Sequence, residues 1–298
     1  KGMYPTLWSG SVSRTPFLAF RLTTEGNVPE QGLNEGSMSD LQYVKVQWDA
    51  ELVTVTIDRP DKLNALNSDV VGELGQVFRE LEDDDGVRGV LITGEGEKAF
   101  VAGADIGELA KMSPISGVRV SRKGQRIFNQ IERFPKPVLA VVGGYALGGG
   151  CELALACHLR VASENAQFGL PEVGLGIIPG YGGTLRLSRI VGLGRAVELT
   201  LTGAMLDAEN AERIGLISAV YPREELLDKA KEFMRRITKN GPLAVQMALE
   251  SIYLAQDSAS ASVLSYESTL FGLLASTGDM QEGMTAFLEK RKADFKGE

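Results

Sequence analysis

PVLAVVGGYALGGGCELALACHLRVAS, residues 137–163, contains the pattern that decides the fold. Residues 137–144 form an apolar run that indicates a buried strand, residues 150–159 have the composition of an apolar helix, and residues 160–163 return to a strand. Glycines fill the turn before the helix. The stretch therefore predicts a strand, a tight corner, a helix and a second strand.

The same unit is repeated on the N-terminal side of this stretch. Residues 53–57 alternate between apolar and polar side chains, as a half-buried strand does, and a turn at residues 59–62 ends them. Apolar side chains at helical spacing predict a helix over residues 68–82, and residues 87–93 follow as a buried strand. Residues 122–134 predict another helix. Repeated β/α units imply an α/β fold with a largely parallel sheet.

Helices replace strands in the C-terminal part of the chain. Helical segments are expected at residues 195–203, 207–215, 223–239, 242–255 and in the run that ends at residue 295. One of them carries an apolar stripe of Leu226, Leu227, Ala230, Phe233, Met234 and Ile237. Such a stripe is wide enough to pack on the core or on another subunit, and the sequence leaves both alternatives open.

Residues 1–37 differ from the rest of the chain. Gly, Pro, Ser and Thr are scattered through them without strand or helix periodicity, and Met38 looks like a start. Residues 1–24 contain three basic side chains and no acidic one, which faintly resembles a transit peptide. We expect residues 1–37 to be an N-terminal extension: a tag, a misplaced start or a targeting segment.

The composition excludes several classes of protein. The net charge of -8 repels the phosphate backbone of nucleic acid, so an anionic ligand must be met by local cations. No stretch approaches the about 18 uninterrupted apolar residues of a membrane span. Cys151 and Cys157 lie in one helix-like segment with their side chains turned apart, so no disulfide is expected between them. With His158 as the only histidine, neither a Ser/His/Asp triad nor a multi-histidine metal site is expected.

Three glycine-rich stretches, at residues 99–106, 143–156 and 171–187, each join an apolar strand-like or turn segment to a helix-like one. At such a corner the first helical N–H groups lack partners and the helix dipole adds partial positive charge. The corner can therefore bind an oxyanion, such as a polarised carbonyl oxygen. The alternative is that each stretch is only a tight turn, and no single stretch excludes it.

Two glutamates lie next to these corners. Glu152 falls in the first turn of the apolar helix, and Glu172 follows Pro171 in an apolar segment. Desolvation raises the pKa of a carboxyl group, and two carboxyl groups at short range push their pKa values apart, so a buried pair can supply one acid and one base near neutral pH. The simpler interpretation is that Glu152 favours a helix N-terminus and Glu172 caps a turn, and the pattern alone leaves it open.

Five segments occur in a recognisable order: RPDKLNALN (59–67), AFVAGADI (99–106), ALGGGCELALAC (146–157), FGLPEVGLGIIPGYGGTLRL (168–187) and AFLEKRKADFK (286–296). Together they resemble the successive motifs of the crotonase (enoyl-CoA hydratase/isomerase) superfamily, closest to its bacterial short-chain hydratases. The resemblance covers roughly residues 42–296. It implies a spiral of ββα repeats over residues 38–235, followed at residues 236–298 by helices through which trimers, often paired into hexamers, assemble.

The resemblance also implies an activity: a hydratase that adds water reversibly to a trans-2-enoyl-CoA thioester and gives 3-hydroxyacyl-CoA, as in fatty-acid beta-oxidation. The backbone N–H groups of Ala104 and Gly149 match the family's oxyanion hole for the thioester carbonyl. Glu152 and Glu172 match the two glutamates that hold one water between them. We expect ionised Glu152 to take a proton from this water as it attacks C3, and protonated Glu172 to deliver a proton to C2.

Further positions match the family's contacts with the coenzyme or the acyl chain: Lys62, Ala65, Ala102, Gly103, Asp105, Ile106, Tyr181, Phe287 and Lys290. Phe287 and Lys290 match a pair that comes from a neighbouring subunit in some members, and Tyr181 is expected to line the acyl pocket. The lysines would supply local positive charge, although a solvated surface role is the alternative for each. We expect no metal, no cofactor beyond the coenzyme A of the substrate, and a cytoplasmic location, with the mitochondrial matrix as the lesser alternative.

His158 departs from the family pattern, because many relatives carry Asp at this position. It lies two turns from Glu152, near the predicted helix end. We expect a structural role for it, favoured by the dipole at the helix C-terminus.

Other functions compete with hydration. A Δ3,Δ2-enoyl-CoA isomerase commonly lacks the first glutamate, so Glu152 argues against it, and nothing marks the differently placed nucleophile that a dehalogenase or hydrolase of this fold would need. An RNA-binding role would use a lysine-rich helix, but residues 68–85 carry a single Arg79 among Glu73, Glu80, Glu82, Asp83, Asp84 and Asp85. These acids would repel phosphate. The preferred acyl length and the physiological direction stay open.

Overall fold

Two sheets organise residues 41–298, the part of the chain that this computed structural model describes; the expected N-terminal extension lies outside these residues. The larger sheet has the order β1-β2-β3-β5-β7-β10. Its strands are β1 (Val44–Asp49), β2 (Leu52–Ile57), β3 (Gly89–Gly94), β5 (Val138–Val142), β7 (Leu159–Ser163) and β10 (Val220–Tyr221). β1 pairs antiparallel with β2, and every later pair is parallel. The predicted α/β fold with a largely parallel sheet is confirmed.

The smaller sheet has the order β4-β6-β8-β9. It consists of β4 (Ala99–Ala102), β6 (Tyr145–Leu147), β8 (Gln167–Gly169) and β9 (Leu206–Asp207). Successive strands alternate between the sheets, since β3, β5 and β7 each belong to the larger sheet and the strand after each belongs to the smaller one. Helices connect these pairs of strands. The chain therefore repeats a ββα unit, as the resemblance implied.

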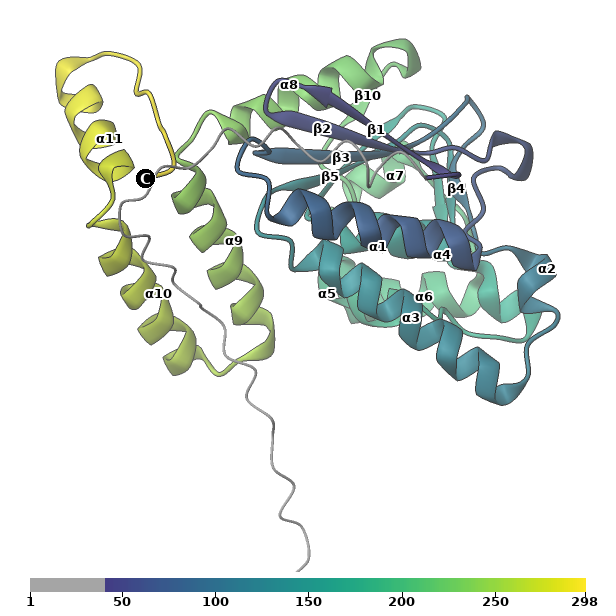
Figure 1. The fold of residues 1–298 in the computed structure, drawn as a ribbon. Helices are drawn as coiled ribbons and strands as arrows, with labels where there is room; N and C mark the ends of the chain where they lie inside the picture. Colours follow the sequence, from purple (N-terminus) through teal and green to yellow (C-terminus); the bar gives the residue numbers. More distant parts are fainter. Residues whose placement is uncertain (1–40) are drawn as a thin grey trace, which may run out of the picture. The chain divides into compact units, whose positions relative to one another are not determined.

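The helices cover and connect the sheets, and α1 lies beside α3 (Figure 1). They are α1 (Ser68–Glu82), α2 (Ile106–Leu109), α3 (Pro114–Glu132), α4 (Gly149–Ala156), α5 (Gly183–Val191), α6 (Leu193–Thr202), α7 (Ala208–Arg213), α8 (Leu226–Thr238), α9 (Pro242–Asp257), α10 (Ser260–Leu274) and α11 (Gly278–Glu289). Three short 3-10 helices are η2 (Pro60–Lys62), η3 (Pro171–Leu175) and η4 (Arg223–Glu225). No helix within residues 41–298 is long and apolar enough to cross a membrane.

The predicted helix at residues 68–82 is confirmed as α1. The side chain of Asn67 accepts the N–H of Val70 at 2.9 Å, which caps the first turn. The apolar positions at helical spacing, including Leu74 and Phe78, are buried against the larger sheet. Amphipathic spacing and the cap together fix where α1 begins and which face it buries.

The alternation predicted for residues 53–57 is wrong in detail, although the strand exists as β2. All six residues of β2 are buried, and Thr54 and Thr56 are only 4% and 8% exposed. The reason is that β2 is an interior strand with helices on both faces of its sheet. The core around α1 covers one face, and a second cluster around α8 covers the other.

The apolar stripe at residues 223–239 packs on the core rather than being left for another subunit. Leu226, Ala230 and Met234 of α8 are buried against Leu52, Leu91 and Leu139 of the larger sheet. Leu227 is the exception, at 40% exposed. The alternative that the sequence left open is therefore decided for most of the stripe.

Two expectations about the C-terminal helices need correction. α10 had no counterpart among the predicted helices. The helix expected to run to residue 295 ends at Glu289, because Lys290 takes a left-handed conformation with φ of 55°. The chain then reverses, and the Arg291 guanidinium pairs with Glu282 at 2.6 Å.

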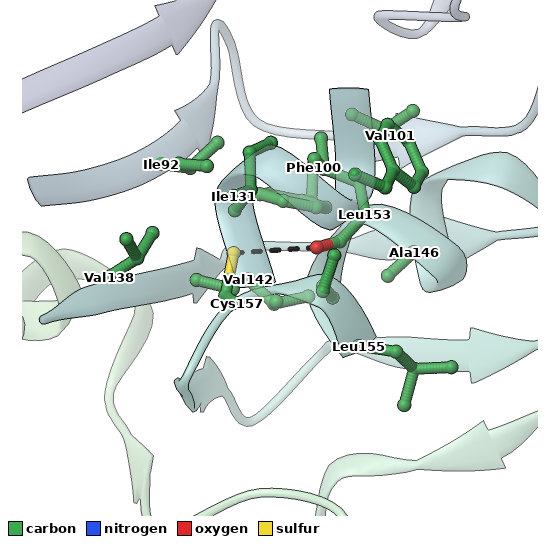
Figure 2. Close-up of a cluster of buried hydrophobic side chains, with 14 of the residues drawn as sticks. Ile92, Phe100, Val101, Ile131, Val138, Val142, Ala146, Leu153, Leu155 and Cys157 are labelled. Atoms are coloured by element: carbon green, nitrogen blue, oxygen red, sulfur yellow. Dashed lines mark hydrogen bonds between the residues drawn. The ribbon is translucent and has the colours of Figure 1, made fainter. Parts of the chain in front are cut away.

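A dense apolar cluster fills the space between the two sheets and anchors α4 (Figure 2). Phe100 of β4, Val142 of β5 and Leu153 of α4 are each at most 1% exposed. Cys157 is free and buried in the same cluster, where its thiol donates to the carbonyl of Leu153 at 3.4 Å. This packing makes α4 a rigid base for the residues at its N-terminus.

Candidate active site

A pocket of about 920 Å³ opens at the N-terminus of α4. Its walls come from the end of β4, from α2 and α3, from the β6–α4 corner, and from residues 171–184. The pocket brings together eight of the positions predicted from the sequence: Ala102, Gly103, Ala104, Ile106, Gly149, Glu152, Glu172 and Tyr181. The three glycine-rich stretches, distant in sequence, thus meet at one site.

Two backbone N–H groups, those of Ala104 and Gly149, lie at this corner of the pocket. β4 and β6 run parallel, with Ala102 opposite Leu147, so the residues that follow each strand emerge side by side. Within the described chain, the N–H groups of Ala104 and Gly149 donate to no backbone acceptor. Gly149 is the first residue of α4, where helical N–H groups have no intrahelical partner. Backbone N–H groups without an acceptor at such a corner are of the kind that can bind a carbonyl oxygen that gains negative charge.

The first glutamate, Glu152, is 2% exposed and held on one side by a turn. Its Oε1 accepts the N–H of Tyr181 at 2.7 Å and the N–H of Gly183 at 2.8 Å. Burial raises the pKa of Glu152, while these two donors and the nearby charge of Arg186 oppose the rise. The two N–H groups favour the ionised form and fix the direction of the carboxylate.

The second glutamate, Glu172, has a different environment. It is 8% exposed, and its Oε2 is buried with no hydrogen-bond partner in the described chain. Burial raises the pKa of Glu172 to about 7, and the charge of Glu152 adds to the rise. A carboxyl group in this environment carries a proton near neutral pH, and its free oxygen can donate or accept one.

Gly148 allows the corner before Gly149 and the Glu172 carboxyl group to lie close together. Its φ of 49° belongs to the left-handed region, and a Cβ there would lie 2.9 Å from Oε1 of Glu172. Any side chain at this position would displace the Glu172 carboxyl group or distort the corner before Gly149. The glycine-rich corner therefore serves both the N–H groups and the glutamate.

Tyr181 closes part of the pocket with its ring. It is 8% exposed and packs edge-to-face on Phe128 of α3, with ring centroids 5.3 Å apart. Burial raises the pKa of its phenol to about 12, so the side chain is neutral at pH 7. Tyr181 lies in the wall of this pocket, and its contact with an acyl chain stays a prediction.

Some predicted residues do not line this pocket. Lys62 is exposed on η2, the Ala65 carbonyl accepts Arg59 at 2.6 Å, and Asp105 caps α2 through the N–H of Gly107. Phe287 and Lys290, at the end of α11, also lie outside the lining, and Phe287 is 82% exposed. The chain by itself does not bring these five to the carboxyl pair.

The outer wall of the pocket was missed from the sequence. It consists of residues on α2, on the loop between α2 and α3, on α3 and on the loop after η3: Leu109, Met112, Val118, Ser121, Arg122, Gln125, Ile177 and Ile178. Arg122 adds a positive charge that no motif indicated. Leu175, Ile177 and Ile178 are apolar in the sequence, but their exposure of 44% to 71%, which marks them as surface rather than core, is seen only in the structure.

His158 has a structural role, but not a charged one. Its Nδ1 accepts the N–H of Val138 at 2.9 Å, and its Nε2 faces the carbonyl of Glu132 at 3.1 Å. Burial lowers the pKa of His158 to about 4, so the expected stabilisation of a protonated ring by the helix dipole is wrong. Within residues 41–298, no three His, Cys, Asp or Glu side chains form a group that could hold a metal ion.

Comparisons with known proteins agree with one another. The family model described as Enoyl-CoA hydratase/isomerase matches residues 47–298. The chain is 46% identical over 255 residues to the Short-chain-enoyl-CoA hydratase of Clostridium acetobutylicum, covering 86% of this chain and 98% of that protein. It is 45% identical over 254 residues to the Crotonyl-CoA hydratase of Syntrophomonas wolfei, covering 85% and 98%. The solved structure of an enoyl-CoA hydratase from Bacillus anthracis matches with a TM-score of 0.84 at 38% identity, over 86% of this chain and 100% of that one.

Proposed function

Because the chain belongs to the enoyl-CoA hydratase/isomerase family, we propose how its buried carboxyl pair adds water to a 2-enoyl-CoA thioester. The enzyme is an enoyl-CoA hydratase. The observation that carries the mechanism is the placement of Glu152 and Glu172 in one pocket with the N–H groups of Ala104 and Gly149. Loss of the enoyl absorbance of crotonyl-CoA, followed in the presence of the purified chain, tests the activity directly.

The thioester carbonyl binds to the N–H groups of Ala104 and Gly149. When water adds at C3, charge moves onto this oxygen as the enolate forms, and the two donors stabilise it more than they stabilise the neutral carbonyl. Each such donor typically contributes about 3 kcal/mol to the transition state. The donors are backbone groups, so the side chains at these positions only need to be small.

The water lies between the two carboxyl groups. Glu152 acts as the base: burial raises its pKa, and the two N–H donors oppose this rise by favouring the ionised carboxylate. Glu172 acts as the acid, because its raised pKa and unpaired Oε2 keep a transferable proton near neutral pH. Water gives one proton to Glu152 as its oxygen attacks C3, and Glu172 gives one proton to C2. In the reverse reaction the roles of the two groups are exchanged.

Isomerisation is not the favoured activity. Moving a proton between C4 and C2 needs one acid–base group beside a stabilised dienolate, and Glu172 would suffice for it. A second buried carboxyl group, fixed by two hydrogen bonds, has a purpose only if a water must be oriented and deprotonated. The presence of Glu152 therefore favours hydration.

The substrate carries all of the chemistry that the site needs beyond these side chains. We propose that the enzyme uses no cofactor or metal other than the coenzyme A of its substrate, that it acts in the cytoplasm in fatty-acid metabolism, and that Lys62, Ala65 and Asp105 reach the coenzyme at the rim of the pocket. An isotherm for acetyl-CoA binding to Lys62→Ala, compared with Lys239→Ala just after the C-terminal end of α8, tests the rim contact.

Hydration is expected to weaken as pH rises through about 7, the raised pKa of Glu172. The proton that Glu172 delivers is present below this pH and lost above it. Hydration releases no net proton, so the carboxyl pair carries one proton in the active enzyme for hydration and also for dehydration. The rate of dehydration is therefore expected to fall over the same alkaline pH range. Initial rates in both directions, from about pH 5 to pH 9, measure kcat/KM. A profile that stays flat to the upper end of this range contradicts the choice of the acid.

Tyr181→Leu is expected to move the preference toward longer acyl chains. Its ring fills part of the pocket wall, and removing it opens space for further methylene groups. We expect the ratio of kcat/KM for octenoyl-CoA over crotonyl-CoA to rise by ~10-fold. Tyr253→Leu on α9, which lies outside this pocket, is the matched control. If both variants keep the wild-type ratio, Tyr181 does not limit chain length.

We also propose that the enzyme assembles as a trimer or a pair of trimers. The C-terminal helices carry large apolar side chains that are 60% to 82% exposed: Ile252, Leu264, Phe271, Met284, Phe287 and Leu288. Exposed apolar surface of this extent is typical of an interface. A neighbouring subunit would also bring Phe287 and Lys290 to the coenzyme. Sedimentation at micromolar concentration is expected to show a trimer or hexamer, and a monomer would rule the assembly out.

A further inference from the structure

We propose that Arg186 is a positioning residue for hydration: it holds the turn at residues 180–183, whose N–H groups orient the Glu152 carboxylate. The inference rests on the proposed role of Glu152 as the base. It assigns a task to a buried arginine that does not line the main pocket and would not touch the substrate.

The turn is built around the carboxylate. Both N–H groups that bind Glu152 Oε1 come from it, one from Tyr181 and one from Gly183. Between them, Gly182 has a φ of 106°, which L side chains rarely adopt, and a Cβ there would lie 2.4 Å from Nη1 of Arg186. The turn is thus in close contact with the carboxylate on one side and with the guanidinium on the other.

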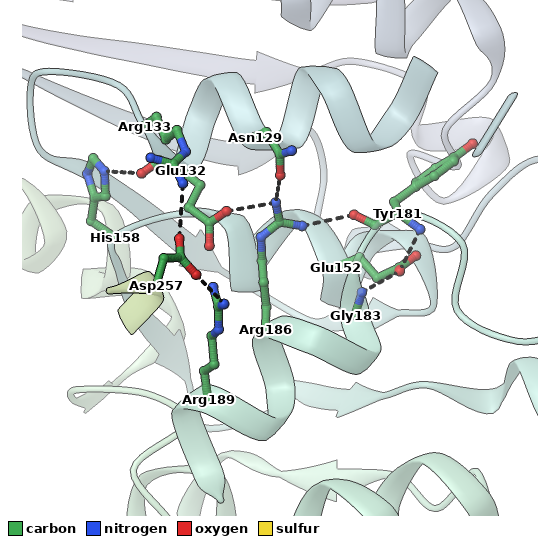
Figure 3. A network of polar contacts seen from close by, with 10 residues as sticks. All are labelled: Asn129, Glu132, Arg133, Glu152, His158, Tyr181, Gly183, Arg186, Arg189 and Asp257. Carbon is green, nitrogen blue, oxygen red and sulfur yellow. Dashed lines mark hydrogen bonds and ion pairs between the residues drawn. The ribbon is translucent and has the colours of Figure 1, made fainter. Parts of the chain in front are cut away.

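Arg186 holds this turn by its carbonyl group. The side chain is 2% exposed, and its Nη1 donates to the carbonyl of Tyr181 at 2.9 Å. Its Nη2 donates to Oδ1 of Asn129 at 2.5 Å and to Oε2 of Glu132 at 2.9 Å, both on α3 (Figure 3). The contacts form a continuous path from α3 through Arg186 and Tyr181 to Glu152. A planar guanidinium suits this path, since it presents several donors in one fixed arrangement.

Neighbouring contacts fix the rest of the turn but not the Tyr181 carbonyl. The carbonyl of Gly180 accepts Ser121 Oγ at 2.6 Å and Gln125 Nε2 at 3.1 Å, both from α3. The Tyr181 carbonyl, one residue on, accepts a side-chain hydrogen bond from Arg186. Without Arg186, the peptide group between Tyr181 and Gly182 can rotate. The N–H groups of Tyr181 and Gly183 would then no longer point at the Glu152 carboxylate.

The positive charge of Arg186 also favours the ionised form of Glu152, as the hydrogen bonds of the turn do. The charged groups that face Glu152 are Arg186 from α5 and Glu172 from η3, while burial raises the pKa values of the adjacent Cys151 and Tyr181 to about 12, so both are neutral. Burial raises the pKa of Glu152, and the Arg186 charge opposes this rise. Removing that charge therefore raises the pKa of the base further and moves the acidic limb of the pH profile upward.

The test needs a variant that folds. Arg186→Met alone would leave the largely buried carboxylate of Glu132, 13% exposed, without its partner, which is destabilising. The double variant Arg186→Met/Glu132→Gln removes both charges and keeps similar volumes, and Arg186→Lys keeps the charge without the planar donors. Arg189→Met is the matched control, one turn along α5, because Arg189 pairs with Asp257 at 2.6 Å away from the pocket. Thermal unfolding of each full-length variant is measured first.

We expect the double variant to lose ~10²-fold in kcat with KM within about 3-fold, and to show an acidic limb about one pH unit higher. Arg186→Lys should restore the position of the limb but only part of kcat. Arg189→Met should match the wild type in both. The wild-type chain is assayed on crotonyl-CoA beforehand, so that failure of the proposed function is distinguished from failure of this role.

A double variant with wild-type kcat overturns the proposal. A reduced kcat with an unmoved acidic limb overturns it as well, because an arginine with only a structural role would lower activity without changing the pKa of the base. If the double variant does not fold, Arg186→Lys decides. A lowered kcat at unchanged KM then supports the positioning role, and a wild-type kcat overturns it.

Discussion

Glu152→Gln and Glu172→Gln are each expected to lower kcat for hydration by at least ~10²-fold, the usual scale for loss of a general acid or base. Both variants should still fold. The amide oxygen at position 152 can accept the same two N–H groups from Tyr181 and Gly183, and glutamine at position 172 removes a group whose Oε2 makes no hydrogen bond in the described chain. Neither amide can exchange a proton with water or with C2.

The control for this pair is Glu209→Gln, the same change at an exposed position of α7. Steady-state hydration of crotonyl-CoA and thermal unfolding should leave the control at wild-type values. More than a tenth of the wild-type kcat in either Glu152→Gln or Glu172→Gln is incompatible with the proposed pair.

Glu172→Ala is expected to abolish exchange of the substrate α-proton as well as hydration, whereas Glu152→Ala should lose hydration much more than exchange. Exchange at C2 needs the group that carries a proton to and from C2, together with stabilisation of the enolate. Hydration needs in addition a group that orients and deprotonates water. The N–H groups of Ala104 and Gly149 survive both changes, because they belong to the backbone.

Deuterium incorporation from D2O at C2 of a saturated acyl-CoA such as butyryl-CoA, whose α-proton can leave to form the enolate, is measured beside hydration of crotonyl-CoA and separates these roles. Each variant serves as the control for the other, since both lose one buried carboxyl group from the same pocket. Equal losses of both reactions in both variants would mean that the two carboxyl groups act as one unit, and the division of labour would be wrong.

The sequence predicted best what depends on long periodic patterns or on side-chain chemistry. α1 was predicted with its bounds because fifteen residues keep one amphipathic spacing. Glu152 and Glu172 stood out as acids in apolar segments, and the family resemblance turned two open alternatives into one site. This assignment depended on the order of the five motifs along the chain, since the composition of any single motif left the alternatives open.

What the sequence did not predict depends on tertiary packing. The strands of the smaller sheet have two to four residues, too few to show a period of 2, so that sheet was missed as a layer. Thr54 and Thr56 are buried because helices cover both faces of β2, which no local pattern reports. The link from Arg186 to Glu152 joins α3, α5 and α4 across more than thirty positions of sequence, and only the folded chain places them together.

In both sheets the spatial order of the strands follows their order in the chain. This order has a consequence for pairing between the edge strands of different molecules. Each later strand of a sheet pairs on the same side of the strand before it, so a chain that lacks its later strands would present a free pairing edge. In the described fold those edges end in β9 and β10, which have only two residues each. A strand so short offers few free N–H and C=O groups to a foreign strand. The last repeat thus stops sheet growth, and a chain truncated before β9 would leave longer strands open to aggregation.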